Sequence, residues 1–129
     1  MWPAADRVRE ALSKVEFSVV VEQFWNEACE YADYVLPSCT APERDNVVIG
    51  RNNRLFLIPR LIDPDDKLPD VEILLRLAHA MGLHSEILDL KDYEAYLNYI
   101  MRLTGVTLEE LKARPEEVDA RLNCQRRYL

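Results

Sequence analysis

Three residue types that build many cofactor and metal sites are scarce in this sequence of 129 residues. The three glycines form no glycine-rich loop of the kind that cradles the phosphates of a dinucleotide. The cysteines, Cys29, Cys39 and Cys124, include no C-x-x-C pair, so we expect reduced thiols rather than a zinc site or a disulfide framework. The two histidines, His79 and His84, are too few and too isolated for a metal centre. The sequence therefore predicts no metal ligand and no catalytic residue in this chain.

Clustered positive charge and long apolar runs are lacking as well. The sequence has 16 Lys and Arg residues against 23 Asp and Glu residues, a formal net charge of -7. A nucleic-acid surface needs clustered Lys and Arg, so no nucleic acid is expected as a partner. No apolar run approaches the roughly 20 residues that span a bilayer, and the first residues lack the basic start of a signal peptide. We therefore expect a soluble, cytoplasmic protein without a membrane span.

Residues 17–48 organise the rest of the chain. Three consecutive valines in residues 17–21 are typical of a buried strand. A short polar helix is predicted over residues 26–31, followed by a second apolar strand over residues 34–36. Pro37 ends this strand, because proline has no N–H for a sheet ladder. The strand-helix-strand pattern predicts two adjacent, buried, parallel strands with a ligand site at their carboxyl ends.

The predicted fold class is α/β: a partial parallel sheet with flanking helices over residues 1–63, then a mainly helical segment over residues 64–129. Apolar spacing, turn residues and capping patterns predict helices over 6–15, 70–81 and 92–103, a hairpin of 46–49 with 55–58, and a capping box at Thr107. Asp70, Gly82 and Gly105 are the expected helix caps. The residues expected on buried helix faces are Val8, Ala11, Leu12 and Val15, then Val71, Leu74, Leu75, Ala78 and Met81, and finally Tyr93, Tyr96, Leu97 and Ile100.

Glu22 and Asn26 are the first candidate site residues. They lie four residues apart, at the end of the first predicted strand and the start of the helix. A carboxylate and an amide at this place can bind the N–H edge of a guanine or pterin, or accept from ribose hydroxyls. Alternatively, Glu22 is a solvated strand end and Asn26 is a plain helix cap.

The loop over residues 38–45 is the second candidate, and Ser38, Thr40 and Glu43 are its candidate binding residues. It combines small hydroxyls, a thiol and a charged Glu-Arg-Asp cluster directly after a predicted strand. Sites of open α/β sheets lie at such loops. The alternative is a salt-linked surface turn, in which each exposed ion pair contributes less than about 1 kcal/mol.

The sequence VVVEQFWNEACEYADYVLPSCTAPERDNV, residues 19–47, resembles the segment VV.D.F.TETA..AD.VLP....E..G of the molybdopterin guanine dinucleotide oxidoreductases, the dimethyl-sulfoxide-reductase and formate-dehydrogenase superfamily. The resemblance continues through LIPR at 57–60, DP at 63–64, PDVEI at 69–73 and LAHAMG at 77–82. It is closest to the transhydroxylase and acetylene-hydratase-like branch. In the family, an Asp and a Thr at two motif positions contact one guanine dinucleotide. Here these positions hold Glu22 and Asn26, which keep hydrogen-bonding chemistry.

The resemblance implies a segment of the catalytic chain of such an enzyme, inactive alone because the metal ligand of the family lies upstream of this part. It implies molybdopterin guanine dinucleotide with molybdenum or tungsten in the complete enzyme, and no cofactor in the isolated chain. The implied partner is the remainder of the catalytic chain or a partner subunit, so the chain is expected to be a fragment, a split subunit or a truncated reading frame. The alternative is a non-catalytic acidic α/β interaction module that forms a homodimer or pairs with another chain.

Overall fold

The computed structural model of the chain describes residues 4–50, 54–114 and 118–119. The chain divides into two compact units, Met1–Ser38 and Cys39–Leu129, which we call unit 1 and unit 2. Within the described ranges, no helix has both the length and the apolar character that a membrane crossing requires. The division into segments 1–63 and 64–129 stays a prediction.

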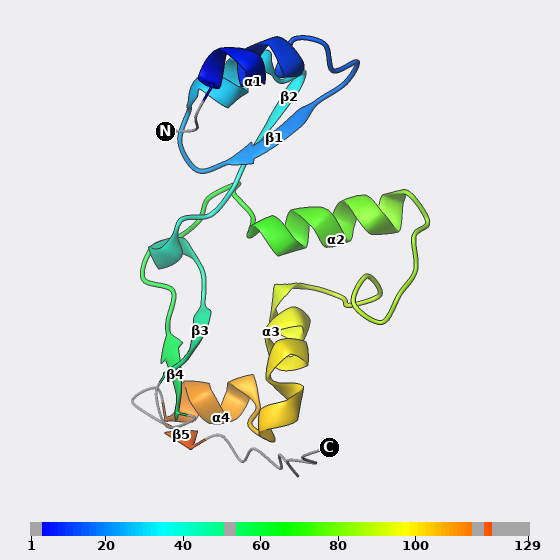
Figure 1. The fold of residues 1–129 in the computed structure, drawn as a ribbon. Coiled ribbons are helices and arrows are strands. Elements are labelled where there is room, and N and C mark those ends of the chain that lie inside the picture. Colours follow the sequence, from blue (N-terminus) through cyan, green and yellow to red (C-terminus); the bar gives the residue numbers. More distant parts are fainter. Residues whose placement is uncertain (1–3, 51–53, 115–117, 120–129) are drawn as a thin grey trace, which may run out of the picture. The chain divides into compact units, whose positions relative to one another are not determined.

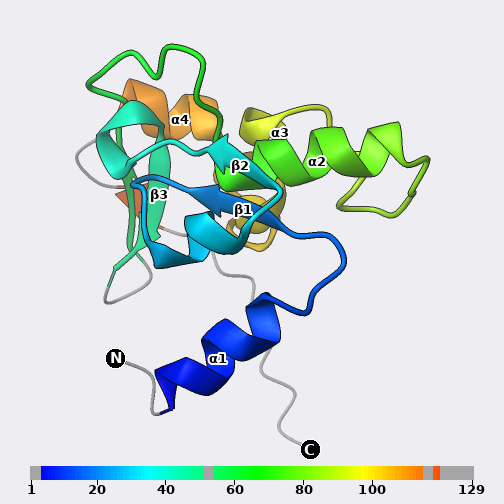
Figure 2. The ribbon, with the colours of Figure 1, turned by 90° about the horizontal axis from the view of Figure 1, so that it is seen from above.

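Unit 1 contains the predicted strand-helix-strand pattern. Its elements in order are α1 (Ala5–Leu12), β1 (Val19–Glu22), the short 3-10 helix η1 (Glu27–Tyr31) and β2 (Tyr34–Pro37). The two strands pair in parallel, with Val20 opposite Val35. The parallel neighbours are therefore confirmed. In both ribbon views α1 and η1 lie next to each other on one side of the strand pair (Figures 1 and 2).

The prediction that both strands of unit 1 are buried is wrong. Val19 and Tyr34 are exposed, and the middle residues of both strands are only half-buried. The predicted buried stripe of α1 is wrong too, because Val8 and Val15 are exposed and no residue of α1 among those described is buried. Two short strands and two short helices supply too little apolar surface to enclose a core.

Unit 2 opens with a short 3-10 helix and an antiparallel hairpin. Its elements are η2 (Ala41–Glu43), β3 (Asn46–Ile49), β4 (Arg54–Ile58), α2 (Asp70–Ala80), α3 (Tyr93–Met101), η4 (Arg102–Thr104), α4 (Leu108–Ala113) and β5 (Val118–Asp119). The predicted hairpin is confirmed, and β4 also pairs with β5, which gives the sheet order β3-β4-β5 (Figure 1). With parallel and antiparallel strands beside helices, the chain has an α/β fold.

The core of unit 2 is built from β4, α3 and α4. Its buried members are Leu55, Leu57, Leu97, Met101, Val106, Leu108 and Leu111. On α3, Met101 is 1% exposed whereas the predicted Ile100 is 41% exposed. Both positions hold apolar residues, so the sequence pattern alone could not tell which of the two faces the core. Packing of α3 on α4 and β4 decides this.

Helix ends were predicted better than helix faces. Thr107 and Glu110 form the predicted capping box, in which the backbone N–H of Glu110 donates to Thr107 Oγ1 over 3.2 Å. Gly82 and Gly105 have the predicted positive φ angles, 67° and 68°. Asp70, however, is the first residue of α2 rather than its cap, since Pro69 holds the cap position.

The buried face predicted for α2 is only partly right. Leu75 and Ala78 are buried, but Leu74 and Met81 are exposed. The described residues of unit 2 offer this helix few packing partners, because the core cluster is built from β4, α3 and α4. The apolar stripe of α2 is therefore wider than the face that the unit covers.

Candidate functional site

Glu22 and Asn26 meet at the carboxyl end of β1. The amide Nδ2 of Asn26 donates to Glu22 Oε2 over 2.8 Å, and the other carboxylate oxygen accepts the backbone N–H of Gln23 over 2.9 Å. Asn26 is also the N-cap of η1, because its Oδ1 accepts the backbone N–H of Ala28 over 2.9 Å. Asn26 thus has the cap role that the alternative interpretation gives it, and a binding role for it stays a prediction. The cap holds the carboxylate and the amide in one fixed arrangement.

Ser38 lies beside this pair in unit 1. Its backbone N–H donates to the carbonyl oxygen of Glu22 over 3.1 Å, which continues the pairing of β1 and β2 by one residue. Parallel strands have their carboxyl ends at the same edge, and the structure brings Glu22, Asn26 and Ser38 together at this edge. The arrangement offers carboxylate acceptors, an amide donor and an amide acceptor.

Thr40 and Glu43 belong to unit 2, where they form the N-terminal capping box of the short helix η2. The backbone N–H and the hydroxyl of Thr40 both donate to Glu43 Oε2 over 2.8 Å. Lys67 donates to the other oxygen of Glu43. The bond to Lys67, followed by the bonds from Thr40, lowers the pKa of Glu43 to about 2. Glu43 is only 8% exposed, so its first role is to order the loop that carries Thr40.

Lys67 was not predicted as a partner of Glu43. It lies 24 residues from Glu43, in a stretch without helical or strand periodicity, so spacing rules for ion pairs do not reach it. The charged cluster around Glu43 was visible in the sequence, but its partner was not.

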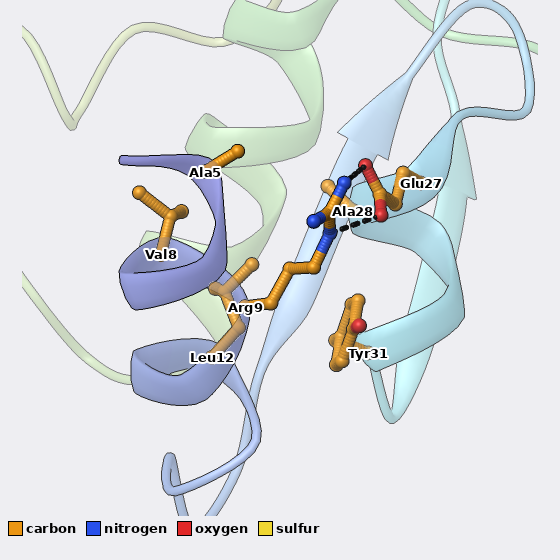
Figure 3. Close-up of a pocket in the computed structure, with 7 residues that line it drawn as sticks. All are labelled: Ala5, Val8, Arg9, Leu12, Glu27, Ala28 and Tyr31. Atoms are coloured by element: carbon orange, nitrogen blue, oxygen red, sulfur yellow. Dashed lines mark hydrogen bonds and ion pairs between the residues drawn. The ribbon is translucent and has the colours of Figure 1, made fainter. Parts of the chain in front are cut away.

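A cavity lies between α1 and η1 of unit 1 (Figure 3). It has a volume of about 500 Å³ and is lined by Ala5, Val8, Arg9, Leu12, Glu27, Ala28 and Tyr31. Figure 3 shows the Arg9 side chain reaching from α1 to Glu27 on η1, where Nε donates to Oε1 over 2.5 Å. This bond lowers the pKa of Glu27. Apolar side chains and one ion pair make this a packing seam and offer no acid–base chemistry.

Metal ligands do not gather in the described part of the chain. No group of three or more His, Cys, Asp or Glu side chains there could hold a metal ion. Cys29 is buried, as predicted for a small apolar residue, and Cys39 is buried as well. Burial raises the pKa of the Cys39 thiol, which keeps it protonated at neutral pH.

Comparison with known proteins covers most of the chain. The family model described as molybdopterin oxidoreductase matches residues 1–80. The chain is 34% identical over 85 residues to a trimethylamine-N-oxide reductase of Vibrio parahaemolyticus, which covers 63% of this chain and 10% of that protein. It is 36% identical over 89 residues to a putative formate dehydrogenase of Staphylococcus haemolyticus, which covers 64% of this chain and 9% of that protein.

A third relative matches over a longer part. The chain is 30% identical over 115 residues to the alpha subunit of an F420-dependent formate dehydrogenase of Methanocaldococcus jannaschii, which covers 85% of this chain and 17% of that subunit. The chain thus spans between about a tenth and a sixth of the length of these relatives. The matched residues 1–80 include Glu22, Asn26 and Ser38. The chain belongs to the molybdopterin oxidoreductase family.

Proposed function

We propose that this chain is a segment of the catalytic chain of a molybdopterin-dependent oxidoreductase and contributes to binding one molybdopterin guanine dinucleotide. The observation that carries the proposal is the joined pair of Glu22 and Asn26 at the carboxyl end of two parallel strands, within the span that matches the family. Ligands of open α/β sheets bind at such strand ends. The molybdenum or tungsten of the bound cofactor supplies the redox chemistry.

The donor set at this strand end fits a guanine dinucleotide. Glu22 accepts hydrogen bonds from N–H groups of a base or from ribose hydroxyls, and Asn26 provides one donor and one acceptor. Ser38 and Thr40 stay predicted binding residues: Ser38 is 3% exposed, and Thr40 belongs to unit 2. Glu43 acts through Thr40, because its carboxylate is already bonded to Thr40 and Lys67. In this proposal Glu22 and Asn26 contact the cofactor, and Glu43 is a positioning residue.

The proposed partner is the remainder of the catalytic chain or a partner subunit, since cofactor enclosure needs more surface than this chain supplies. The placement in the transhydroxylase and acetylene-hydratase-like branch and the cytoplasmic location stay predictions. The names of the relatives span oxide reduction and formate oxidation, so we propose no substrate.

The test uses the full-length enzyme, or the complex reassembled with its partner chain, carrying Glu22→Ala or Asn26→Ala. Glu22→Ala removes charge-assisted hydrogen bonds worth about 1.5 to 3 kcal/mol, which lowers cofactor affinity roughly ten- to a hundredfold, and Asn26→Ala is expected to lower it as well. The measurement is molybdenum and pterin content after extensive dialysis. Glu30→Ala is the matched control, because Glu30 is an exposed carboxylate on η1. Unchanged content in both site variants contradicts the proposed role.

An acidic interaction module without catalytic function is the second candidate. The exposed aromatic side chains of Phe24 and Trp25, 72% and 71% exposed, favour it because they offer an apolar surface to another chain. Metal and pterin analysis of the protein isolated from its own host, with partner chains retained, separates the two functions. A homodimer without pterin supports the module and contradicts cofactor binding.

A further inference from the structure

Unit 2 contains a polar cavity of about 620 Å³, and of its lining the proposed function uses only Glu43. Side chains from the loop before β3, the loop before α2, and the helices α3 and α4 line it. Its size lies within the range of pockets that bind small organic molecules. Five acidic and four basic residues line the cavity, so the formal charges nearly balance.

Arg44 is the one guanidinium of this lining with an unsatisfied buried atom among the described side chains. Its Nε is buried and has no hydrogen-bond partner. Native proteins pair nearly all buried N–H donors, because a buried donor without an acceptor has lost its hydration and gained nothing in return. Arg44 is one of the residues that line the cavity, so an acceptor bound there beside its guanidinium would be stabilising.

The carboxylates around Arg44 are already engaged. Glu43 accepts from Lys67 and Thr40. Asp45 accepts the backbone N–H of Arg60 over 2.8 Å and lies 3.6 Å from the ammonium group of Lys112. The acceptors nearest to Arg44 along the chain are therefore bonded to other groups.

The remaining acidic side chains of the lining have partners too. Glu94 pairs with Lys112, and Glu72 pairs with Arg76 over 2.6 Å. Asp92 caps α3 by accepting the backbone N–H of Ala95 over 2.9 Å. Each carboxylate of the lining thus has a bond within unit 2, and Arg44 keeps a positive charge that an external acceptor can bind.

We propose that this cavity binds a carboxylate monoanion on the guanidinium of Arg44. The planar guanidinium presents parallel N–H donors whose geometry matches a carboxylate. A monoanion is preferred to a dianion, because the five acidic residues of the lining repel a second negative charge. The protonated thiol of Cys39 and the hydroxyl of Tyr93, whose pKa is raised by burial, leave the region around Arg44 without a further negative charge.

The carboxylate site rests on Arg44, which has no role in the proposed cofactor binding, although Glu43 belongs to both. All of its residues lie in unit 2, whereas the pair of Glu22 and Asn26 lies in unit 1. A failure of the cofactor proposal therefore does not affect the carboxylate proposal. Cofactor content of the Glu22 and Asn26 variants tests the first, and binding of acetate at Arg44 tests the second.

The test follows the Nε–H signal of Arg44 by nuclear magnetic resonance in the full chain. Acetate, inorganic phosphate and chloride are added in separate titrations at constant ionic strength. We expect acetate to shift the signal saturably, phosphate to bind more weakly, and chloride to give no saturable shift. An unchanged signal with acetate overturns the proposal, and so does an equal response to chloride. Tighter binding of phosphate overturns the assignment to a monoanion.

Variants then assign the binding to Arg44. Arg44→Gln removes the charge and the donor fork, and we expect acetate affinity to fall about tenfold or more, measured by calorimetry. Arg44→Lys keeps the positive charge but loses the planar guanidinium. We expect its affinity for acetate to lie between that of the unmodified chain and that of Arg44→Gln. Arg114→Gln is the matched control, because this exposed arginine of unit 2 does not line the cavity. Unchanged affinity in both Arg44 variants overturns the proposal.

Discussion

The two units differ in how they are stabilised. Unit 2 has a core in which Leu55 and Leu111 are fully buried, formed by a strand and two helices distant in sequence. Unit 1 is stabilised mainly by one pair of parallel strands and the N-cap of Asn26, and its ion pair of Arg9 with Glu27 is exposed. The packed core and the pair of Glu22 and Asn26 are therefore in different units, although the predicted binding residues Thr40 and Glu43 belong to unit 2. Unit 1 carries the joined site pair, while unit 2 carries the packing.

Unit 1 lies wholly within residues 1–80, which match the family model. Several apolar side chains of its strand-helix-strand pattern are exposed, among them Val19 and Tyr34. Surfaces of this kind are typical of protein that packs on further protein. Under the proposed function, the remainder of the catalytic chain covers them.

Truncation of a core side chain is expected to have the largest effect, and it tests directly whether unit 2 depends more on packing than unit 1 does. Leu111→Ala leaves a cavity in the core of unit 2, and we expect it to lower the free energy of unfolding by about 2 to 5 kcal/mol. Val8→Ala in α1 is the matched truncation in unit 1, and its effect is expected within about 0.5 kcal/mol because Val8 is exposed. Denaturant unfolding of the full chain measures both.

Equal losses in the two variants would contradict the distinction between the units. The two variants can be compared only if they unfold with the same cooperativity. The slope of the free energy of unfolding against denaturant concentration measures this cooperativity. Ile100→Ala makes the same test within unit 2, because the exposed Ile100 and the buried Met101 lie on the same helix, α3. We expect Ile100→Ala to destabilise the chain less than Met101→Ala.

The order and type of the elements could largely be predicted from the sequence. Valine runs, Pro37 and the Thr107 capping box are local patterns with local causes, and they marked the parallel strands, the end of β2 and the start of α4. Burial could not be predicted as well. It depends on what covers each face, and Val8 and Leu74 are exposed although each lies on the predicted apolar face of its helix.

The candidate site was predicted only as far as its local parts. Glu22 and Asn26 lie four residues apart, so one strand end and one helix cap were enough to place them together. The contacts of Glu43 with Lys67 and the environment of Arg44 join segments distant in sequence. No spacing rule connects such segments, because loops with irregular backbone bring them together.

Loss of the Glu43 carboxylate is expected to have the next largest effect, and it depends on pH. The pKa of Glu43 falls from 4.5 to about 2 in the folded chain, so the unfolded chain binds the proton more tightly. The charged carboxylate therefore stabilises the fold fully above about pH 4.5, and this contribution is lost as the pH falls toward about 2. Glu43→Gln should reduce the pH dependence of stability in this window, measured by thermal unfolding at a series of pH values.

Glu109→Gln is the matched control for this pH dependence, because Glu109 is an exposed carboxylate of α4 in the same unit. We expect its pH profile to follow that of the unmodified chain. If Glu43→Gln keeps the full pH dependence between about pH 4.5 and 2, other carboxylates cause it and the assignment to the bond with Lys67 is wrong.

The smallest effect is expected for the ion pair that closes the seam of unit 1. Arg9 and Glu27 form two hydrogen bonds, but their side chains are 42% and 57% exposed, so water and salt screen the attraction. We expect Arg9→Gln to leave the unfolding temperature of the chain nearly unchanged at physiological salt. Lys14→Gln is the control, because it breaks an exposed pair with Glu10 within the same helical region. A clearly larger loss for Arg9→Gln would show that the contact of α1 with η1 stabilises unit 1 more than its exposure indicates.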